Sequence, residues 1–260
     1  MGGAIMEPAM SLSEKSLSGK NALVTGASGG VGGYIAMELA RAGCNVAINY
    51  RDNSVRAEEL ANSILKLGVR ALCVKADVTD SEQVLSMIES TEHSLGRVDI
   101  LINNAGISID GMSWKLANSS FEKTIETNLF GPFYCTKAVL PGMRERLWGR
   151  VINISSVVGQ IGVVGASAYA ASKAGLIGLT KSTAKEVAKK YITVNVLTLG
   201  YIKTGMFLAL NNGLREEVEK NIPFGSAGDP EDVAKIVVFL CSDAAKYITG
   251  ATIDVNGGLH

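Results

Sequence analysis

Histidine, paired cysteine motifs, a charge excess and long apolar runs are all scarce in this sequence, and each absence narrows its function. His93 and His260 are the only histidines, and the four cysteines lie far apart with no CxxC motif, so no cysteine–histidine metal site is expected. The 25 basic residues balance 25 acidic ones, whereas a nucleic-acid-binding surface needs a basic excess, so no nucleic-acid partner is expected. No apolar run reaches the roughly 18 residues of a membrane span, so no membrane partner is expected.

Few linker signals divide the chain. No Pro-, Ser- or charge-rich stretch interrupts the 260 residues, which predicts one domain over residues 19–260. Residues 1–18 lack the basic start and apolar stretch of a signal peptide and are interpreted as a flexible extension. All four cysteines stand in apolar runs, which is typical of buried free thiols in a reducing compartment. We therefore expect a cytoplasmic protein.

Strand-like and helix-like segments alternate along the chain. The expected strands span residues 21–25, 45–50, 70–75, 98–102, 151–154, 193–199 and 251–255. The expected helices span residues 30–42, 54–67, 81–95, 119–139, 169–190 and 230–241, and a further helical stretch leads to Trp148. A kink is expected at Gly131–Pro132. This order predicts an α/β fold with a Rossmann-type doubly wound parallel sheet, whose ligand lies at the carboxyl ends of the strands.

A glycine-rich turn follows the first expected strand. Gly26, Gly30 and Gly32 have the spacing G-x3-G-x-G. Without side chains the backbone can turn tightly and approach a pyrophosphate, and the next helix supplies free N–H groups and the positive end of its dipole. A dinucleotide site is therefore expected, with a structural loop as the alternative. The residues of this turn that are expected to contact the cofactor are Thr25, Gly26, Ser28, Gly30, Val31 and Gly32.

The ends of the second and third expected strands bear on the type of cofactor. Tyr50 occupies the position where an acid would bind the ribose 2′-hydroxyl of NAD, and Arg51 follows it. An arginine suits a 2′-phosphate, so the sequence favours NADP (NADPH), while Asp52 keeps NAD as an alternative. The alternative to a cofactor contact is that Arg51 is a solvated loop residue that pairs with Asp52. Asp77 and Val78 are expected near the adenine, unless Asp77 only caps the following helix.

A polar loop follows the fourth expected strand, beginning at Asn103. Asparagine side chains bond to the backbone and stabilise tight turns. Asn104, Ala105 and Gly106 are therefore expected to wall the cofactor pocket, with a plain turn as the alternative.

Tyr169 and Lys173 stand four residues apart in an expected helix and so share a face. A free tyrosine has a pKa of about 10, and a nearby ammonium favours the phenolate and lowers this pKa. Such a hydroxyl can give or take a proton at a reacting oxygen; a chance surface pair is the alternative. Ser156 lies thirteen residues before Tyr169, at the end of an expected strand, and is favoured over Ser155 to bond a substrate carbonyl.

In this order the glycine turn, the loop from Asn103, Asn128, Ser156 and the Tyr169-x3-Lys173 pair resemble the short-chain dehydrogenase/reductase family over about residues 19–258. The resemblance implies a Rossmann-type single domain, a nicotinamide cofactor and usually a homotetramer. It implies that Asn128, Ser156, Tyr169 and Lys173 are catalytic, that Asn128 positions a water, and that Tyr169 and Lys173 also contact the cofactor. By the same resemblance, further cofactor contacts come from Gly200, Ile202 and Thr204.

Within that family, residues 151–159, 169–180, 192–196 and 247–258 resemble β-ketoacyl-[acyl-carrier-protein] reductases. This resemblance implies NADPH-dependent reduction of a 3-oxoacyl-[acyl-carrier-protein] in fatty acid synthesis, with basic residues docking the acidic carrier. Lys190 matches one docking position; Arg144 and Arg146 lie near another, whose aligned residue is Leu147. The alternatives are a family member acting on a sugar, polyol, steroid or quinone-like carbonyl, and a catalytically silent nucleotide-binding protein.

The segment after the sixth expected strand departs from the family. Leu199–Gly200 stands where the family usually has Pro–Gly, and the loss of proline's fixed φ is expected to loosen this loop. Residues 205–226 are expected to form a lid, in which Met206, Phe207 and Leu208 give an apolar edge suited to an acyl chain.

Overall fold

The computed structural model describes residues 16–260, and these form an α/β domain around one parallel sheet. Its seven strands lie in the order β3-β2-β1-β4-β5-β6-β7. The strands are β1 (Asn21–Val24), β2 (Asn45–Tyr50), β3 (Ala71–Lys75), β4 (Ile100–Asn103), β5 (Gly149–Ser156), β6 (Ile192–Leu199) and β7 (Thr252–Val255). The predicted Rossmann-type doubly wound sheet is confirmed.

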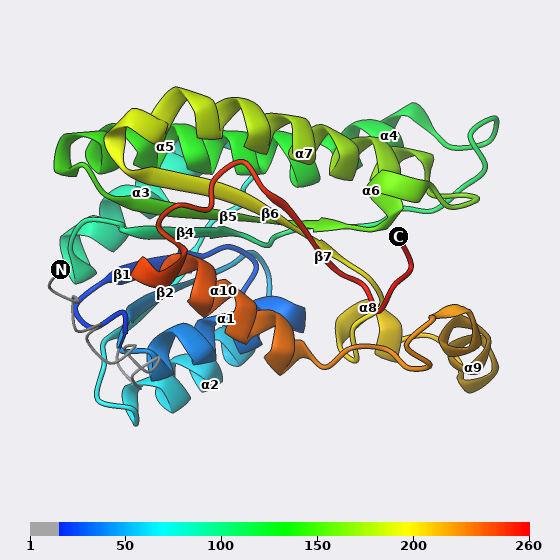
Figure 1. Cartoon of the computed structure of the whole chain (residues 1–260), viewed down its shortest axis with the longest axis horizontal. Coiled ribbons are helices and arrows are strands. Elements are labelled where there is room, and N and C mark those ends of the chain that lie inside the picture. Colours follow the sequence, from blue (N-terminus) through cyan, green and yellow to red (C-terminus); the bar gives the residue numbers. More distant parts are fainter. Residues whose placement is uncertain (1–15) are drawn as a thin grey trace, which may run out of the picture.

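Helices cover both faces of this sheet (Figure 1). On one face lie α1 (Gly30–Arg41), α2 (Ser54–Leu65) and α10 (Pro230–Cys241); on the other lie α3 (Ser81–Leu95), α5 (Gly131–Arg146) and α7 (Ser167–Val187). Because side chains alternate along a strand, β1 feeds both cores: Val24 packs with Leu39 and Val237, whereas Leu23 packs with Met87 and Val139. Two apolar layers therefore hold the sheet rigid beneath the site.

The strand order reverses between β1 and β4. β1 pairs with β2 on one side and with β4 on the other, so that Ala22 lies between Val46 and Ile100. At this switch point the connections leave in opposite directions, which opens a crevice at the carboxyl ends of the two strands. The glycine turn and the loop from Asn104 meet there.

The stretch predicted as one kinked helix is built from three segments. α4 (Asn118–Ile125) runs into a π-helical turn (Glu126–Phe130), which continues as α5. The N–H of Gly131 reaches the carbonyl of Glu126 five residues back, and Pro132 has no N–H to donate. The wider turn sets Asn128 in the interior, fully buried.

Several short elements were not predicted. They are α6 (Val158–Ile161), α8 (Gly205–Leu208), α9 (Asn212–Asn221) and the 3₁₀ turn Asp243–Ala245. Residues Ala188–Lys190, predicted as the end of a helix, form a 3₁₀ turn that continues α7. α8 and α9 lie within the segment expected to be a lid. There Phe207, Ile222 and Ala227 form a small core of their own.

The start of the domain lies close to the predicted boundary at residue 19. Leu17 is buried, and its N–H donates to the carbonyl of Ala42 at 2.9 Å, so the chain is anchored from this residue onward. Residues 1–15 of the predicted extension lie outside the described residues.

Candidate active site

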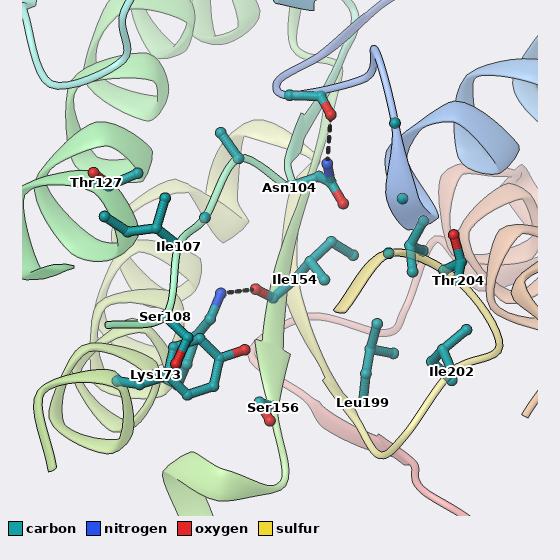
Figure 2. Close-up of a pocket in the computed structure, with 18 of the residues that line it drawn as sticks. Asn104, Ile107, Ser108, Thr127, Ile154, Ser156, Lys173, Leu199, Ile202 and Thr204 are labelled. Atoms are coloured by element: carbon teal, nitrogen blue, oxygen red, sulfur yellow. Dashed lines mark hydrogen bonds between the residues drawn. The ribbon is translucent and has the colours of Figure 1, made fainter. Parts of the chain in front are cut away.

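A cavity of about 660 Å³ opens at the carboxyl ends of the central strands (Figure 2). The expected site residues that line it are Gly26, Ser28, Gly30, Val31, Arg51, Asp77, Val78, Asn104, Ala105, Gly106, Ser156, Tyr169, Lys173, Gly200, Ile202 and Thr204. Four others, Thr25, Gly32, Tyr50 and Asn128, are not among the lining residues. The structure therefore places most of the expected cofactor-binding residues and expected catalytic residues around one cavity.

The glycine turn packs directly on the loop after β4. A Cβ on Gly26 would lie 2.9 Å from the Cα of Ala105, and a Cβ on Gly32 would overlap the side-chain amide of Asn104. That amide donates to the Thr25 carbonyl at 2.9 Å. It also donates to the Gly26 carbonyl at 3.3 Å (Figure 2). The Thr25 hydroxyl in turn accepts from the N–H groups of Asn104 and Ala105, at 3.0 and 3.1 Å. Thr25 and Gly32 thus do not line the cavity themselves but hold together the two loops that form its wall.

The turn fits the phosphates of a dinucleotide. Gly26 and Gly30 have positive φ angles of 63° and 59°, which glycine adopts without strain. α1 begins at Gly30, and its N-cap residue Gly29 makes no side-chain capping bond. The first N–H groups of this helix, with the positive end of its dipole, are therefore available to an anion in the cavity.

The other end of the cavity carries the charged residues after β2 and β3. Arg51 Nε donates to Asp52 Oδ2 at 2.7 Å, and that hydrogen bond is the main reason why the pKa of Arg51 is raised. The surface pair that was weighed as an alternative is therefore present, and both of its residues line the cavity. Asp77 does not cap α3, since Asp80 does; its carboxylate instead accepts from the N–H and hydroxyl of Thr79.

Tyr169 and Lys173 lie together on α7, as their spacing predicts. The Lys173 amine is 5.6 Å from the centroid of the Tyr169 ring and donates to the Ile154 carbonyl at 2.8 Å (Figure 2). Burial lowers the pKa of Lys173 to about 8.

The expected lowering of the Tyr169 pKa is wrong for this structure. Burial disfavours the phenolate and raises the pKa, and the Ser156 hydroxyl offsets this effect only in part. Asp110 raises it further. The physical reason is that desolvation outweighs the proximity on which the sequence argument relied.

The two serines that end β5 divide their roles. Ser155 donates its hydroxyl to the Lys173 carbonyl at 2.9 Å, which fixes α7 against the sheet. The Ser156 oxygen accepts from the Val158 N–H at 3.2 Å, and its hydroxyl also acts on the Tyr169 phenol. Ser156 is therefore the better placed of the two for a substrate oxygen.

Asn128 lies behind the cavity wall, in the π-helical turn. Its Oδ1 accepts from the Ile107 N–H at 2.8 Å, and its Nδ2 donates to the Ile107 carbonyl at 2.8 Å and to the Ser172 hydroxyl at 3.1 Å. These bonds tie the loop after β4 to α7. The implied role of Asn128 in positioning a water stays a prediction.

The comparisons with known proteins agree with this geometry. A family model described as "Enoyl-(Acyl carrier protein) reductase" matches residues 26–260. The chain is 44% identical over 241 residues to the 3-oxoacyl-[acyl-carrier-protein] reductase FabG of Staphylococcus aureus, covering 93% of this chain and 98% of that protein. The chain belongs to the short-chain dehydrogenase/reductase family.

Two other similar proteins have different names from FabG. Nodulation protein G of Azospirillum brasilense is 42% identical over 244 residues, covering 94% of this chain and 99% of that protein. A solved structure described as a putative short-chain alcohol dehydrogenase from Sinorhizobium meliloti superposes with a TM-score of 0.89 at 38% identity, covering 94% of this chain and 97% of that one. Membership makes the protein an oxidoreductase that uses a nicotinamide cofactor, but these names do not agree on a substrate.

The chain differs from the usual family pattern at Leu199, which lies at the end of β6. β6 pairs through Leu199 with Ser156 on one side and Val255 on the other. The Leu199 carbonyl accepts from the Val157 N–H at 2.9 Å, and the Gly200 N–H donates to Val255 at 2.9 Å. A proline at position 199 would keep both of these hydrogen bonds, so the expected loosening of the segment stays a prediction.

Sequence reasoning missed several residues of the site. Ile107, Ser108 and Asp110 line the cavity from the loop after β4. Asn49 lines it as well, and its Oδ1 accepts from the N–H of Gly26 at 3.1 Å. An amide inside the apolar run of β2 was the signal that could have revealed Asn49, whereas nothing local distinguishes Asp110. Tyr50, which was expected in the pocket, packs against the core on the α1 side.

Residues 16–260 lack two further features. No helix in that range combines the length and apolar character needed to cross a bilayer. No group of three or more His, Cys, Asp or Glu side chains in the same range is arranged to hold a metal ion.

Proposed function

We propose that this protein catalyses the NADPH-dependent reduction of a 3-oxoacyl thioester carried by acyl carrier protein. The observation that carries the proposal is the grouping of Ser156, Tyr169 and Lys173 in one cavity with the glycine turn. The FabG relatives, at 44% and 43% identity in S. aureus and Pseudomonas aeruginosa, support the choice of substrate.

The proposed chemistry needs a hydride donor and a proton donor. NADPH, when bound, supplies the hydride to the carbonyl carbon. Tyr169, whose raised pKa keeps the phenol protonated at neutral pH, gives the proton to the carbonyl oxygen. Ser156 orients that oxygen by a hydrogen bond.

Lys173 and Thr25 support this chemistry from the wall of the site. The Lys173 amine, held by the Ile154 carbonyl, is a cation beside the Tyr169 ring and would bond the nicotinamide ribose. Its pKa of about 8 leaves it mostly charged at neutral pH. Thr25 holds the phosphate-binding turn to the loop after β4, which forms part of the cavity wall.

Docking of a carrier protein has partial support. Lys190 and the exposed Arg144 remain candidates for contacts with an acidic carrier. Arg146 is not a good candidate, because its guanidinium bonds the Val98 carbonyl at 2.8 Å and lies 3.6 Å from Asp99. The homotetramer implied by the resemblance and the cytoplasmic location expected from the cysteines also stay predictions; light scattering tests the first.

A second candidate is reduction of another small carbonyl, favoured by the solved structure described as a putative short-chain alcohol dehydrogenase. The Arg51–Asp52 pair leaves NAD as an alternative cofactor for either reaction, because Asp52 already neutralises part of the charge that a 2′-phosphate would meet.

The test measures oxidation of the reduced cofactor, with an acetoacetyl thioester free or linked to carrier protein, using NADPH and then NADH. We expect the carrier-linked substrate with NADPH to give the highest kcat/KM. Tyr169→Phe should lower kcat by at least about a hundredfold. Tyr134→Phe, which removes a hydroxyl from α5 and not from the cavity, is the matched control.

The possible outcomes separate the hypotheses. Turnover of a sugar, polyol or steroid carbonyl in preference to the thioester would favour the second candidate. Binding of NADPH without reduction of any carbonyl tested would indicate a catalytically silent nucleotide-binding protein.

A further inference from the structure

One carboxylate lies at the catalytic end of the cavity. The charged residues among the described lining of the cavity are Arg51, Asp52, Asp77, Asp110 and Lys173. The first three follow β2 and β3, at the dinucleotide end. Lys173 is buried and bonded to the sheet, so Asp110 is the charged side chain that the catalytic end presents to a ligand entering from solvent.

The structure holds Asp110 in this position by two kinds of contact. Its Oδ1 accepts from the Ser108 hydroxyl at 2.7 Å. The next residue, Gly111, donates its N–H to the Gly165 carbonyl at 2.7 Å and forms a parallel bridge with Ala166. The loop after β4 is thereby joined to the segment before α7, one residue away from the carboxylate.

Apolar side chains also line the cavity that contains Asp110. Among them are Val158, Val163, Ala166, Phe207 and Leu210. Apart from Arg51 at the dinucleotide end, the described lining offers no arginine, and its one lysine is the buried Lys173. A ligand carboxylate would therefore meet Asp110 with no exposed cation to balance it.

Asp110 also acts across the site on the reacting group. Burial is the main cause of the raised pKa of Tyr169, and the charge of Asp110 adds to it, as expected of a carboxylate in the same cavity. The same charge acts on any negative charge that a substrate carries beside its carbonyl.

We propose that Asp110 is a specificity-determining residue that disfavours anionic carbonyl substrates, such as 3-oxo acids, relative to uncharged 3-oxo esters and thioesters. The inference rests on the proposed function and narrows its substrate class. For like charges about 6 Å apart at an effective dielectric constant of about 40 to 80, Coulomb repulsion corresponds to roughly a three- to tenfold discrimination.

The test compares methyl acetoacetate with acetoacetate, which differ by one negative charge, at saturating NADPH. The measured quantity is the ratio of their kcat/KM values. Asp110→Asn should lower this preference for the neutral ester by about three- to tenfold. Glu89→Gln, on the exposed face of α3, removes the same charge far from the cavity and should leave the ratio unchanged.

Salt separates an electrostatic effect from a structural one. Raising the ionic strength should reduce the preference of the wild type and leave that of Asp110→Asn almost constant. A ratio unchanged in Asp110→Asn, or an equal loss on both substrates, would overturn the proposal.

The outcome for Asp110 can be read even if the proposed function fails. If the thioester is not reduced but another ketone is, the same ratio is measured on that ketone and its carboxylated analogue. If nothing is reduced, the binding of acetoacetate and its methyl ester to the NADPH complex, followed by nucleotide fluorescence, replaces the rates. Equal affinities in wild type and variant would then reject the inference.

Discussion

Replacement of Gly32 by alanine tests whether the phosphate-binding turn depends on close contact with the loop after β4. The new Cβ would overlap the Asn104 amide and lie 3.0 Å from its Cγ and 3.1 Å from the Gly26 carbonyl. Asn104 would have to move, and its bonds to the carbonyls of Thr25 and Gly26, at 2.9 and 3.3 Å, would be lost.

The magnitude follows from these contacts. Two hydrogen bonds are worth about 1 kcal/mol each, and overpacking costs about 1–3 kcal/mol. The gain of about 1 kcal/mol from alanine in a helix offsets part of this, so the free energy of unfolding should fall by about 2–4 kcal/mol. For a domain of this size Tm should fall by about 5–15 °C.

Denaturation curves and NADPH titrations of the Gly32→Ala variant provide the assay. NADPH affinity should fall more than about tenfold, because the turn and the loop are displaced together. Gly178→Ala is the matched control: it lies within α7 with no atom within 4 Å of a new Cβ, so stability should be unchanged or rise by up to about 1 kcal/mol. Equal stability of wild type and Gly32→Ala would refute the reasoning.

Three further predictions follow from the site. Asn128→Ala should lower the free energy of unfolding by about 2–3 kcal/mol, since it removes three hydrogen bonds of a buried side chain; an unchanged urea midpoint would contradict this. The pKa of Lys173 is about 8 in the folded protein and 10.5 ordinarily. Between these pH values the unfolded chain binds more protons than the folded protein, so the contribution of Lys173 to stability should rise with pH. Denaturation curves of Lys173→Met should lack that rise. Arg51→Ser should weaken NADPH binding about tenfold and leave NADH binding unchanged, and equal losses for both in titrations would argue against a 2′-phosphate contact.

The parts of the molecule that sequence predicted well depend on local spacing. Alternating apolar segments gave the sheet, and the four-residue interval placed Tyr169 beside Lys173 on one helix. The glycine spacing likewise marked the turn at the start of α1. Each of these features is decided by residues within a few positions of one another.

The parts that were missed depend on contacts between distant segments. The π-helical turn around Asn128 needs one more residue than an α-helical turn, which apolar periodicity does not reveal. Asp110 lies next to Gly111, which bridges to Ala166 in a distant segment of the chain. The direction of the Tyr169 pKa shift was wrong because spacing reports proximity but not burial.

The partner of Lys173 is the carbonyl of Ile154, an atom of the main chain. Because every residue type carries that carbonyl, side-chain exchange at position 154 leaves the acceptor in place as long as β5 keeps its pairing with β4 and β6. Alanine scanning at position 154 therefore cannot detect this hydrogen bond. Only a change to the peptide unit itself, such as an ester in place of the amide that follows Ile154, would weaken the acceptor and reveal how far the lysine depends on it.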